Sequence, residues 1–426
     1  MNYLYFIIGI FVSSISFGQV NSNSISGADS NQTAPATPKK EESPLDKTIL
    51  QDSNEGPKNS QNRESNKKDK IETKDKMTKS MEIKGTSDDE LPNDELKKDS
   101  DKSTTLRSQE QTLKNSFIQT KIASSTQTRQ RSPSPLQQAE MQNVVDQYQK
   151  TAPNSFEYYY FKYVSGNYNV DLIGDLLEAK KLKPNNVDVH VQLAAYYFIK
   201  KDDKNLKENL DFLFQTKKIE PELPTYAEHL LESVTQNGIL ITHGFDDTYS
   251  VLYVQKILNK REDVQLISLD FLQSEFYRNS LKNSGFSIPK STIIDVDFLE
   301  SFCEANSSKN LQLSMTIPKP YLEEISSKLS VLGLSMLYDE NPTNLIEKNI
   351  QIYEKFIQTD SFPSFTSEKT KKLSSNYLPM LISLKNEYEK LGNMTGEASK
   401  SDTKYVEQIE TAIQKIKVQS ALNKKM

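Results

Sequence analysis

The chain has 426 residues, a formal net charge of −5 and 9% aromatic residues, so it is long enough for two or three folded domains with apolar cores. The charge is small for this length and no face is strongly basic, which excludes nucleic acid as an expected partner. The single cysteine, Cys303, excludes an internal disulfide and a cysteine-cluster metal site.

Residues 1–18 are predicted to be a signal peptide. Leu4 to Val12 form a short apolar core, and the small residues Ser16 and Gly18 offer a cleavage site before Gln19. The stretch is shorter than the roughly 18 to 20 apolar residues that a membrane span needs, although an uncleaved anchor is the alternative. We therefore expect an exported protein, periplasmic or outer-membrane-associated, without a transmembrane span after signal removal. The composition resembles that of exported proteins of the Bacteroidota.

Residues 19–135 are predicted to be a disordered, low-complexity tether. The segment is rich in Ser, Asn, Gln, Lys, Asp and Glu, and its isolated apolar residues keep no period. Lys67 to Lys76 mixes both signs of charge, which favours a solvated segment over one that binds lipid or nucleic acid. A flexible coil of roughly 115 residues would reach about 60 Å from end to end.

Residues 136–236 are predicted to form tetratricopeptide-like helical repeats. Pro153, Pro184 and Pro221 each precede a helix, and their spacings of 31 and 37 residues bracket the repeat length of about 34. Two helix pairs fit between these prolines, and the first pair turns at Gly166. An ordinary helical bundle is the alternative interpretation.

Residues 237–340 are predicted to form an α/β module. Ile239 to Ile241 is an uninterrupted apolar run, as expected of a buried parallel strand, and Val264 to Leu269 repeats the pattern after an amphipathic helix. Two further strands, LQLSMTI from Leu311 and LGLSMLY from Leu332, flank a helix that begins at Pro320. Four strands alternating with helices predict a small, mainly parallel βαβ sheet with right-handed crossovers.

Residues 341–426 are predicted to be helical, with two long helices forming an antiparallel hairpin. Apolar residues recur at helical spacing in both: Tyr377, Leu381, Leu384, Tyr388 and Leu391 in one, and Tyr405, Ile409, Ile413 and Ile416 in the other. The predicted fold class is thus α/β plus all-α: helical repeats, a βαβ module and a C-terminal helical hairpin behind a long tail.

Part of the α/β module resembles a known family. The stretch GFDDTYS, from Gly244 to Ser250, followed by VLYVQ, resembles the motif GDNDTYP followed by LWYLQ. That motif occurs in the soluble C-terminal α/β domain of bacterial protein O-mannosyltransferase-like membrane proteins. The stretch from Leu311 to Glu340 also resembles the closing strand, helix and strand of that domain. Phe245, Asp246 and Ser250 depart from the motif. The resemblance does not imply transferase activity, because the family's catalysis belongs to its multispanning part.

The turn after the first strand carries the candidate ligand-binding residues His243, Asp246, Asp247 and Thr248. It lies at the carboxyl end of a parallel strand, where open α/β sheets usually bind ligands. The simpler interpretation is that Asp246 or Asp247 caps the following helix. Both carboxylates would repel a phosphate at that helix end, and two carboxylates without a third ligand do not make a metal site. We expect no metal and no cofactor.

No catalytic residue is predicted. A strand followed by His-Gly resembles the oxyanion turn of α/β-hydrolases, but that fold needs a GxSxG elbow followed by an acid and a histidine. The chain has no GxSxG, and its histidines, His190, His229 and His243, all precede the position that the fold requires.

Four tyrosines are candidates for a partner-binding surface on the repeats: Tyr158, Tyr159, Tyr196 and Tyr197. The alternative is that they fill the core between helices. The expected function is that of a noncatalytic exported adaptor or scaffold, which binds a protein partner in a secretion, motility or glycosylation assembly of the cell envelope. The alternative is a glycan-binding or glycosyltransferase-related enzyme subunit that uses the turn from His243 to Thr248.

Overall fold

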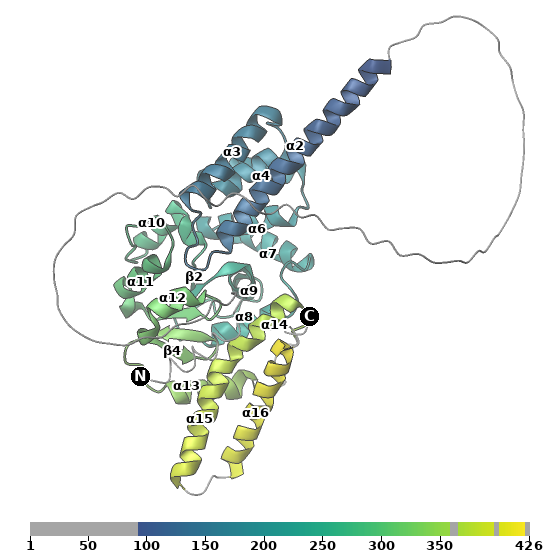
Figure 1. Ribbon diagram of the computed structural model, residues 1–426. Helices are drawn as coiled ribbons and strands as arrows, with labels where there is room; N and C mark the ends of the chain where they lie inside the picture. The colour runs from purple at the N-terminus through teal and green to yellow at the C-terminus, as the bar shows by residue number, and fades with distance from the viewer. Residues whose placement is uncertain (1–92, 358–364, 396–399, 422–426) are drawn as a thin grey trace, which may run out of the picture. The chain divides into compact units, whose positions relative to one another are not determined.

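The computed structural model describes residues 93–357, 365–395 and 400–421. The predicted signal peptide, residues 1–18, and residues 19–92 of the predicted tether lie outside this part of the chain. The described residues form helices and one five-stranded sheet (Figure 1). Within these ranges, no helix combines the length and the apolar character needed to cross a membrane.

The elements divide into a helical region, an α/β module and C-terminal helices. The helical region contains α2 (Asn93–Ser125), α3 (Pro135–Thr151), α4 (Phe156–Ser165), α5 (Ile173–Leu182), α6 (Val187–Lys200), α7 (Asp203–Gln215) and α8 (Leu223–Glu232). The module contains β1 (Ile239–Thr242), α9 (Gly244–Lys256), β2 (Gln265–Ser268), α10 (Glu275–Asn283), α11 (Val296–Ala305), β3 (Leu311–Ser314), α12 (Lys319–Glu324), β4 (Leu329–Leu332) and β5 (Ser335–Tyr338). The C-terminal helices are α13 (Leu345–Ile352), α14 (Glu368–Ser374), α15 (Leu378–Thr395) and α16 (Lys400–Ala421).

Side-chain caps set the start of several helices in the helical region. Ser134 and Gln137 form a capping box at α3, Ser155 accepts from the third residue of α4, and Asn186 accepts from the third residue of α6. Each such cap contributes about 1 kcal/mol to helix stability. The helix starts that were predicted after Pro153, Pro184 and Pro221 are confirmed, and α4 packs on α5 as α6 packs on α7.

The prediction that disorder extends to residue 135 is wrong at its C-terminal end, because α2 spans Asn93–Ser125. Phe117 of α2 is 2% exposed and stacks on Phe161 of α4, with 4.1 Å between the ring centroids. The hydroxyl of Tyr148 in α3 donates to the carbonyl of Glu110 at 2.9 Å. One buried aromatic in a polar helix is too sparse to produce an apolar period, which is why the sequence did not predict this contact.

The sheet has the strand order β2-β1-β3-β5-β4. β1 pairs in parallel with β2 and β3, whereas β5 pairs antiparallel with both β3 and β4. Four of the five strands therefore run in one direction, but the sheet is mixed, with two parallel and two antiparallel pairings, rather than mainly parallel as predicted. The βαβ unit of β1, α9 and β2 is confirmed.

The end of the module differs from the prediction, which placed a single helix, beginning at Pro320, between the strands that start at Leu311 and Leu332. The chain instead forms a hairpin of β4 and β5 around Gly333 and Leu334. Gly333 has a φ of +58°, and a Cβ there would lie 2.0 Å from Ser233 Oγ, so both conformation and space require glycine. The sequence did not predict this turn, because Gly333 is its only turn-forming residue within an otherwise largely apolar run.

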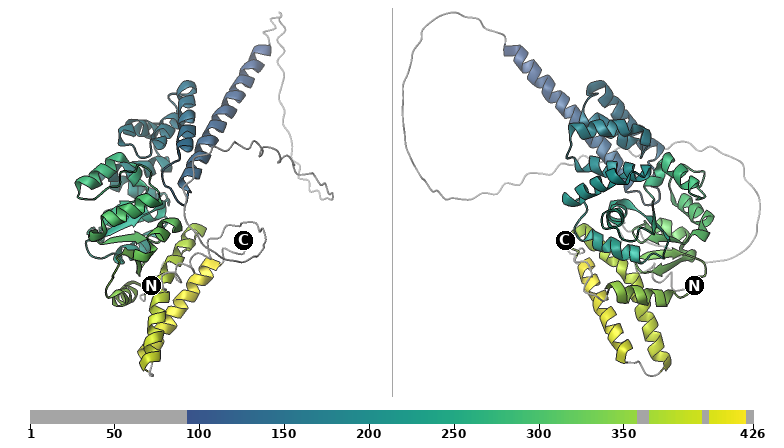
Figure 2. Two further views of the ribbon diagram at one scale, coloured as in Figure 1. Left: turned by 60° about the vertical axis from the view of Figure 1, so that its left-hand side comes forward. Right: turned by 180° about the vertical axis from the view of Figure 1, so that it is seen from behind.

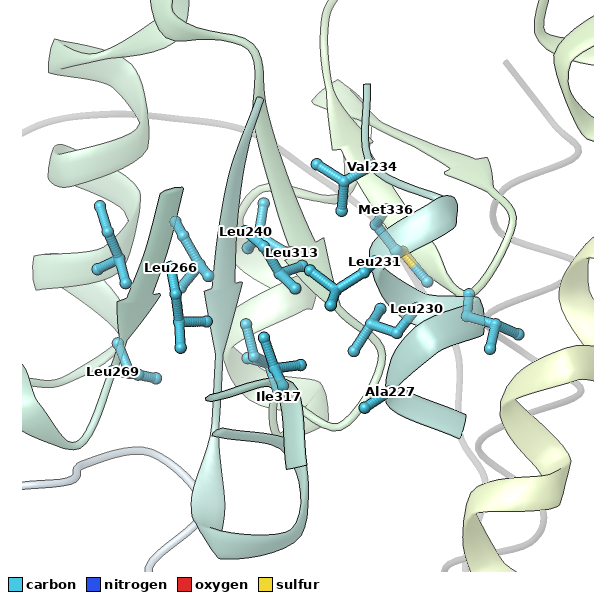
Figure 3. Packing of buried hydrophobic residues seen from close by; sticks show 14 of the residues in the cluster. Ala227, Leu230, Leu231, Val234, Leu240, Leu266, Leu269, Leu313, Ile317 and Met336 are labelled. Atoms are coloured by element: carbon cyan, nitrogen blue, oxygen red, sulfur yellow. The ribbon is translucent and has the colours of Figure 1, made fainter. Parts of the chain in front are cut away.

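The core of the module lies between the sheet and the helices that cover it. Apolar side chains of α8 and the turn after it lie against side chains from three strands, as Figure 3 shows. These residues are Ala227, Leu230, Leu231 and Val234 on the helix side, and Leu240, Leu313 and Met336 on the sheet side. Each fully buried leucine contributes roughly 1.5–3 kcal/mol. The contact joins the helical region to the module through a shared core.

The predicted C-terminal hairpin is confirmed, because α15 and α16 lie side by side in both Figure 1 and Figure 2. Leu381 and Leu384 of α15, and Ile409 and Ile416 of α16, are fully buried, as their spacing predicted. The hydroxyl of Tyr377, just before α15, lies 2.8 Å from Nδ1 of His229 in α8, which links the hairpin to the helical region.

Candidate functional site

The C-terminal ends of β1 and β3 lie side by side at one edge of the sheet. The chain leaves β1 through α9 to β2 on one side, and then passes back beyond β1 to β3 on the other side. In open α/β sheets, ligands bind outside the strand ends at such a reversal. The predicted site residues lie here, because they follow Thr242, the last residue of β1.

Helix α9 begins at Gly244, before either aspartate of the turn. Its N-cap is His243, which makes no side-chain cap hydrogen bond. Gly244 has a φ of +76°, a left-handed conformation that favours glycine. The interpretation that Asp246 or Asp247 caps the helix is therefore wrong, since both lie inside its first turn.

Asp247 is 1% exposed and its Oδ2 accepts a hydrogen bond of 2.8 Å from Thr316 Oγ1. Within the described part of the chain, its buried Oδ1 has no hydrogen-bond partner. Burial raises the pKa of Asp247 to about 6, while the hydroxyls of Ser314 and Thr316 and the backbone N–H of His243 act in the opposite direction. Because Thr316 follows β3, this bond ties the first turn of α9 to the end of the neighbouring strand.

His243 keeps part of its surface exposed, but its Nε2 atom is buried and has no hydrogen-bond partner among the described residues. Burial lowers the pKa of His243 to about 4, an effect that Asp270 opposes and Arg131 reinforces. The ring is therefore neutral at pH 7. Thr316 Oγ1 lies 3.4 Å from the carbonyl oxygen of His243, so His243 and Asp247 flank the same threonine.

Thr248 holds β1 and β2 together beneath the start of α9. Its hydroxyl lies 2.9 Å from Thr242 Oγ1 and 3.4 Å from Ser268 Oγ, at the ends of the two strands. Thr248 is 1% exposed, whereas Asp246 is half-buried. Thr248 is thus a structural residue, and His243 Nε2 and Asp247 Oδ1 are among the buried polar atoms that have no hydrogen-bond partner in the described part of the chain.

An ion pair that the sequence did not predict lies beside the turn. Arg131, between α2 and α3, donates to Asp270 Oδ1 from Nε at 2.8 Å and from Nη2 at 2.6 Å. Asp270 Oδ2 accepts from the backbone N–H of Gly244 at 2.7 Å, so this carboxylate does what the predicted cap would have done. Burial acts to raise the pKa of Asp270, but Arg131, His243 and the Gly244 N–H together hold it below its usual value.

Lys121, in the last turns of α2, approaches the same ion pair. Its Nζ donates a long hydrogen bond of 3.4 Å to Asn167 Oδ1. Burial lowers the pKa of Lys121 to about 8, with attraction by Asp270 opposing and repulsion by Arg131 reinforcing the shift. Lys121 and Arg131 both belong to the segment that was predicted to be a tether, where no local pattern marks a long-range contact. Asp270 did carry a signal, since it follows the second predicted strand.

The four candidate tyrosines are divided between core and surface. Tyr158 is 9% exposed and belongs to the core that α2 to α6 share, so the core interpretation holds for it. Tyr197 packs against that core and against the core of the module. Tyr159 and Tyr196 are half-buried, and each contacts its neighbouring tyrosine with 5.3 Å between ring centroids.

The chemistry of the turn favours hydrogen bonding over metal binding. Across the described ranges, no three His, Cys, Asp or Glu side chains are grouped so that they could hold a metal ion. The neutral ring of His243 and the carboxyl group of Asp247 can instead exchange hydrogen bonds with a polar, uncharged group.

In a comparison with protein families, residues 224–424 match the model described as TMEM260-associated domain 2. The matched range runs from α8 through the C-terminal hairpin and includes the stretches Gly244 to Ser250 and Leu311 to Glu340. Comparisons with curated proteins and with solved structures found no match.

Proposed function

We propose that this protein is a noncatalytic adaptor of the bacterial cell envelope, which binds a protein partner through its helical region. In this proposal the chain is exported in a member of the Bacteroidota and is periplasmic or outer-membrane-associated. The helices α4 to α7 act as tetratricopeptide-like repeats, and the module holds them in place.

The observation that carries the proposal is the pairing of Arg131 with Asp270, together with the bond from Gly244 to the same carboxylate. This buried ion pair at the edge of the sheet joins the segment between α2 and α3 to the module. A catalytic carboxylate needs access to a substrate, whereas Asp270 is 9% exposed and bonded on both oxygens. Such an arrangement supports a rigid scaffold better than an enzyme.

The helical region supplies a surface on which a partner can bind. Tyr159 and Tyr196 are half-buried, and tyrosine combines a large contact area with little loss of side-chain entropy. Phe276 of α10 is 40% exposed and lies beneath Lys200 of α6, with 4.0 Å between Nζ and the ring centroid. Aromatic side chains such as Phe276 are enriched in protein interfaces, whereas lysine is depleted there.

Photo-crosslinking in intact cells tests the proposal. A photoreactive phenylalanine analogue replaces Tyr159 or Tyr196 in the full chain, and a control chain carries it at Val418, which is 60% exposed on α16. We expect the two tyrosine positions to crosslink to the same envelope protein and the control position not to do so. Equal crosslinking from all three positions would contradict the proposal. So would a metal-dependent sugar transfer by the purified protein that is lost in Asp247→Asn.

A further inference from the structure

The sheet ends at β4, and one short helix covers the outer side of this strand. Within the described ranges β4 pairs only with β5, and α13 lies beside it (Figure 1). The carbonyl of Val331 bonds to α13, and hydrogen bonds alternate along an antiparallel pair, so the main-chain groups of Leu329 and Val331 point away from β5. An edge of this kind is a template for the addition of another strand.

Asn349 of α13 takes the place of a strand residue at this edge. Its side chain is 1% exposed, donates from Nδ2 to the carbonyl of Val331 at 3.0 Å, and accepts the N–H of Gly333 on Oδ1 at 2.7 Å. In a parallel ladder a single residue makes these two bonds, because it pairs with the residues on either side of its neighbour, which here is Leu332. One side-chain amide thus fills one position of a parallel strand, and the main-chain groups of Leu329 have no strand partner in the described part of the chain.

The helix that carries Asn349 is held weakly on the module. It has eight residues, fewer than the roughly 12–15 that an isolated helix needs, and all eight are described. Asn349 is the one buried residue among them, and the apolar residues of the helix are half-buried. The π-helical turn that follows, Tyr353–Ile357, is fixed more firmly, because Tyr353 is 4% exposed and Glu354 accepts from the hydroxyl of Tyr405 at 2.6 Å. Once the two amide bonds break, α13 can swing away from β4 about this turn.

The opposite edge of the sheet is closed by a group of the core. Tyr277 of α10 is 6% exposed, and its hydroxyl donates to the carbonyl of Leu266 in β2 at 3.4 Å. Release of this contact would expose a large aromatic ring, which is unfavourable. Release of Asn349 exposes a polar side chain that water can solvate, so β4 is the edge that can open.

We propose that the β4 edge binds an extended, apolar segment of a partner protein, which adds as a strand parallel to β4 after α13 swings away. The main chain of the segment takes over the two bonds of Asn349 and supplies those that Leu329 lacks. Apolar side chains fit this edge, since Leu329 and Val331 are 3% and 8% exposed and β4 has no charged residue. This site is independent of the adaptor proposal, because it lies on the module rather than on the helical region.

Amide hydrogen exchange of the full chain tests the opening of the edge. Asn349→Leu has a similar volume and removes both bonds, whereas Asn349→Asp keeps the acceptance from Gly333. We expect the Gly333 amide to exchange about 10-fold faster in Asn349→Leu and at an intermediate rate in Asn349→Asp. The amides of β2 beside Tyr277 should keep their wild-type rates and report an intact fold. Unchanged exchange at Gly333 in Asn349→Leu would overturn the role of Asn349 at this edge.

Binding of a fluorescent peptide tests the occupant. The probe is Val-Ile-Val-Thr-Val-Ile between pairs of lysines, and its control is N-methylated throughout this segment, so that it has no main-chain donors there. We expect Asn349→Leu to bind the probe about 10-fold more tightly than wild type, because α13 no longer competes, and neither chain to bind the control. Equal affinity of the two chains for the probe, or equal binding of the control, would contradict the proposal. So would a concentration-dependent dimer of Asn349→Leu in sedimentation without the probe, because a second copy of the chain would then take the edge.

Discussion

Removal of the Arg131 guanidinium is the sharpest test of how the helical region is joined to the module. The side chains of Arg131 and Asp270 are 8% and 12% exposed, so little solvent screens their attraction. Breaking a buried ion pair by removal of one partner costs about 3–5 kcal/mol, because the other charge stays buried. We therefore expect Arg131→Met to lose about 3–5 kcal/mol of unfolding free energy at pH 7, out of a typical total of about 5–15 kcal/mol.

Urea denaturation of four chains measures this effect: wild type, Arg131→Met, Asp270→Asn and the double variant. Asparagine can still accept the N–H of Gly244, so Asp270→Asn removes charge while it retains that bond. The double variant should be more stable than Arg131→Met alone, because it has no unpaired carboxylate. Arg131→Lys is the matched control, since it keeps the charge and loses the two-fold contact.

The pH dependence has a definite sign. The pKa of Asp270 is held below its usual value, so the stabilisation by the pair is complete above the unfolded pKa of about 3.9 and is lost as the pH falls through the lower folded-state pKa. In Arg131→Met, burial without the guanidinium raises the pKa of Asp270 instead. The deficit of the variant should therefore shrink as the pH falls from 7 toward 4. A loss below about 1 kcal/mol at pH 7, or a double variant whose loss equals the sum of the single losses, would refute this reasoning.

Three further predictions concern other parts of the chain. The pKa of Asp247 is raised from a reference of 3.8 to about 6, so the unfolding free energy falls by about 3 kcal/mol as the pH rises from 4 through 6, at about 1.4 kcal/mol per pH unit. In urea titrations, Asp247→Asn should therefore be more stable than wild type by about 1–2 kcal/mol at pH 8 and show no gain at pH 4. Phe117→Ala should cost about 3–5 kcal/mol and move the start of the protease-resistant fragment from before Phe117 to near Pro135; an unchanged fragment would contradict the packing of α2. Intact-mass analysis should find a mature chain that starts at Gln19, and envelope protein that retained residues 1–18 would favour the membrane anchor instead.

Local patterns in the sequence were sufficient to predict the elements that position the site. The apolar run Ile239 to Ile241 lies in β1, and the periodic Leu381, Leu384, Ile409 and Ile416 are buried in the hairpin of α15 and α16. Each of these signals acts within a few residues, because burial on one face imposes the spacing. The location of His243 to Thr248 at the strand end followed from the same logic.

The contacts inside the site could not be predicted in the same way. Arg131 lies in a polar segment without a period, and its partner Asp270 is 139 positions away. The unpartnered atoms of Asp247 and His243 depend on what surrounds them in space rather than on their neighbours in the chain. The capping interpretation was wrong for a related reason, since the carboxylate of Asp270 takes the first N–H of α9 and allows the helix to start at Gly244.

The separation of 139 positions between Arg131 and Asp270 also has a kinetic consequence. A contact between distant positions carries a large loop-closure entropy until the intervening chain is ordered, so this ion pair should form after the folding transition state. An interaction that is absent from the transition state slows unfolding and leaves the folding rate nearly unchanged. The ion pair therefore acts mainly on the lifetime of the folded state: without it, the protein should refold at nearly the normal speed and unfold much sooner.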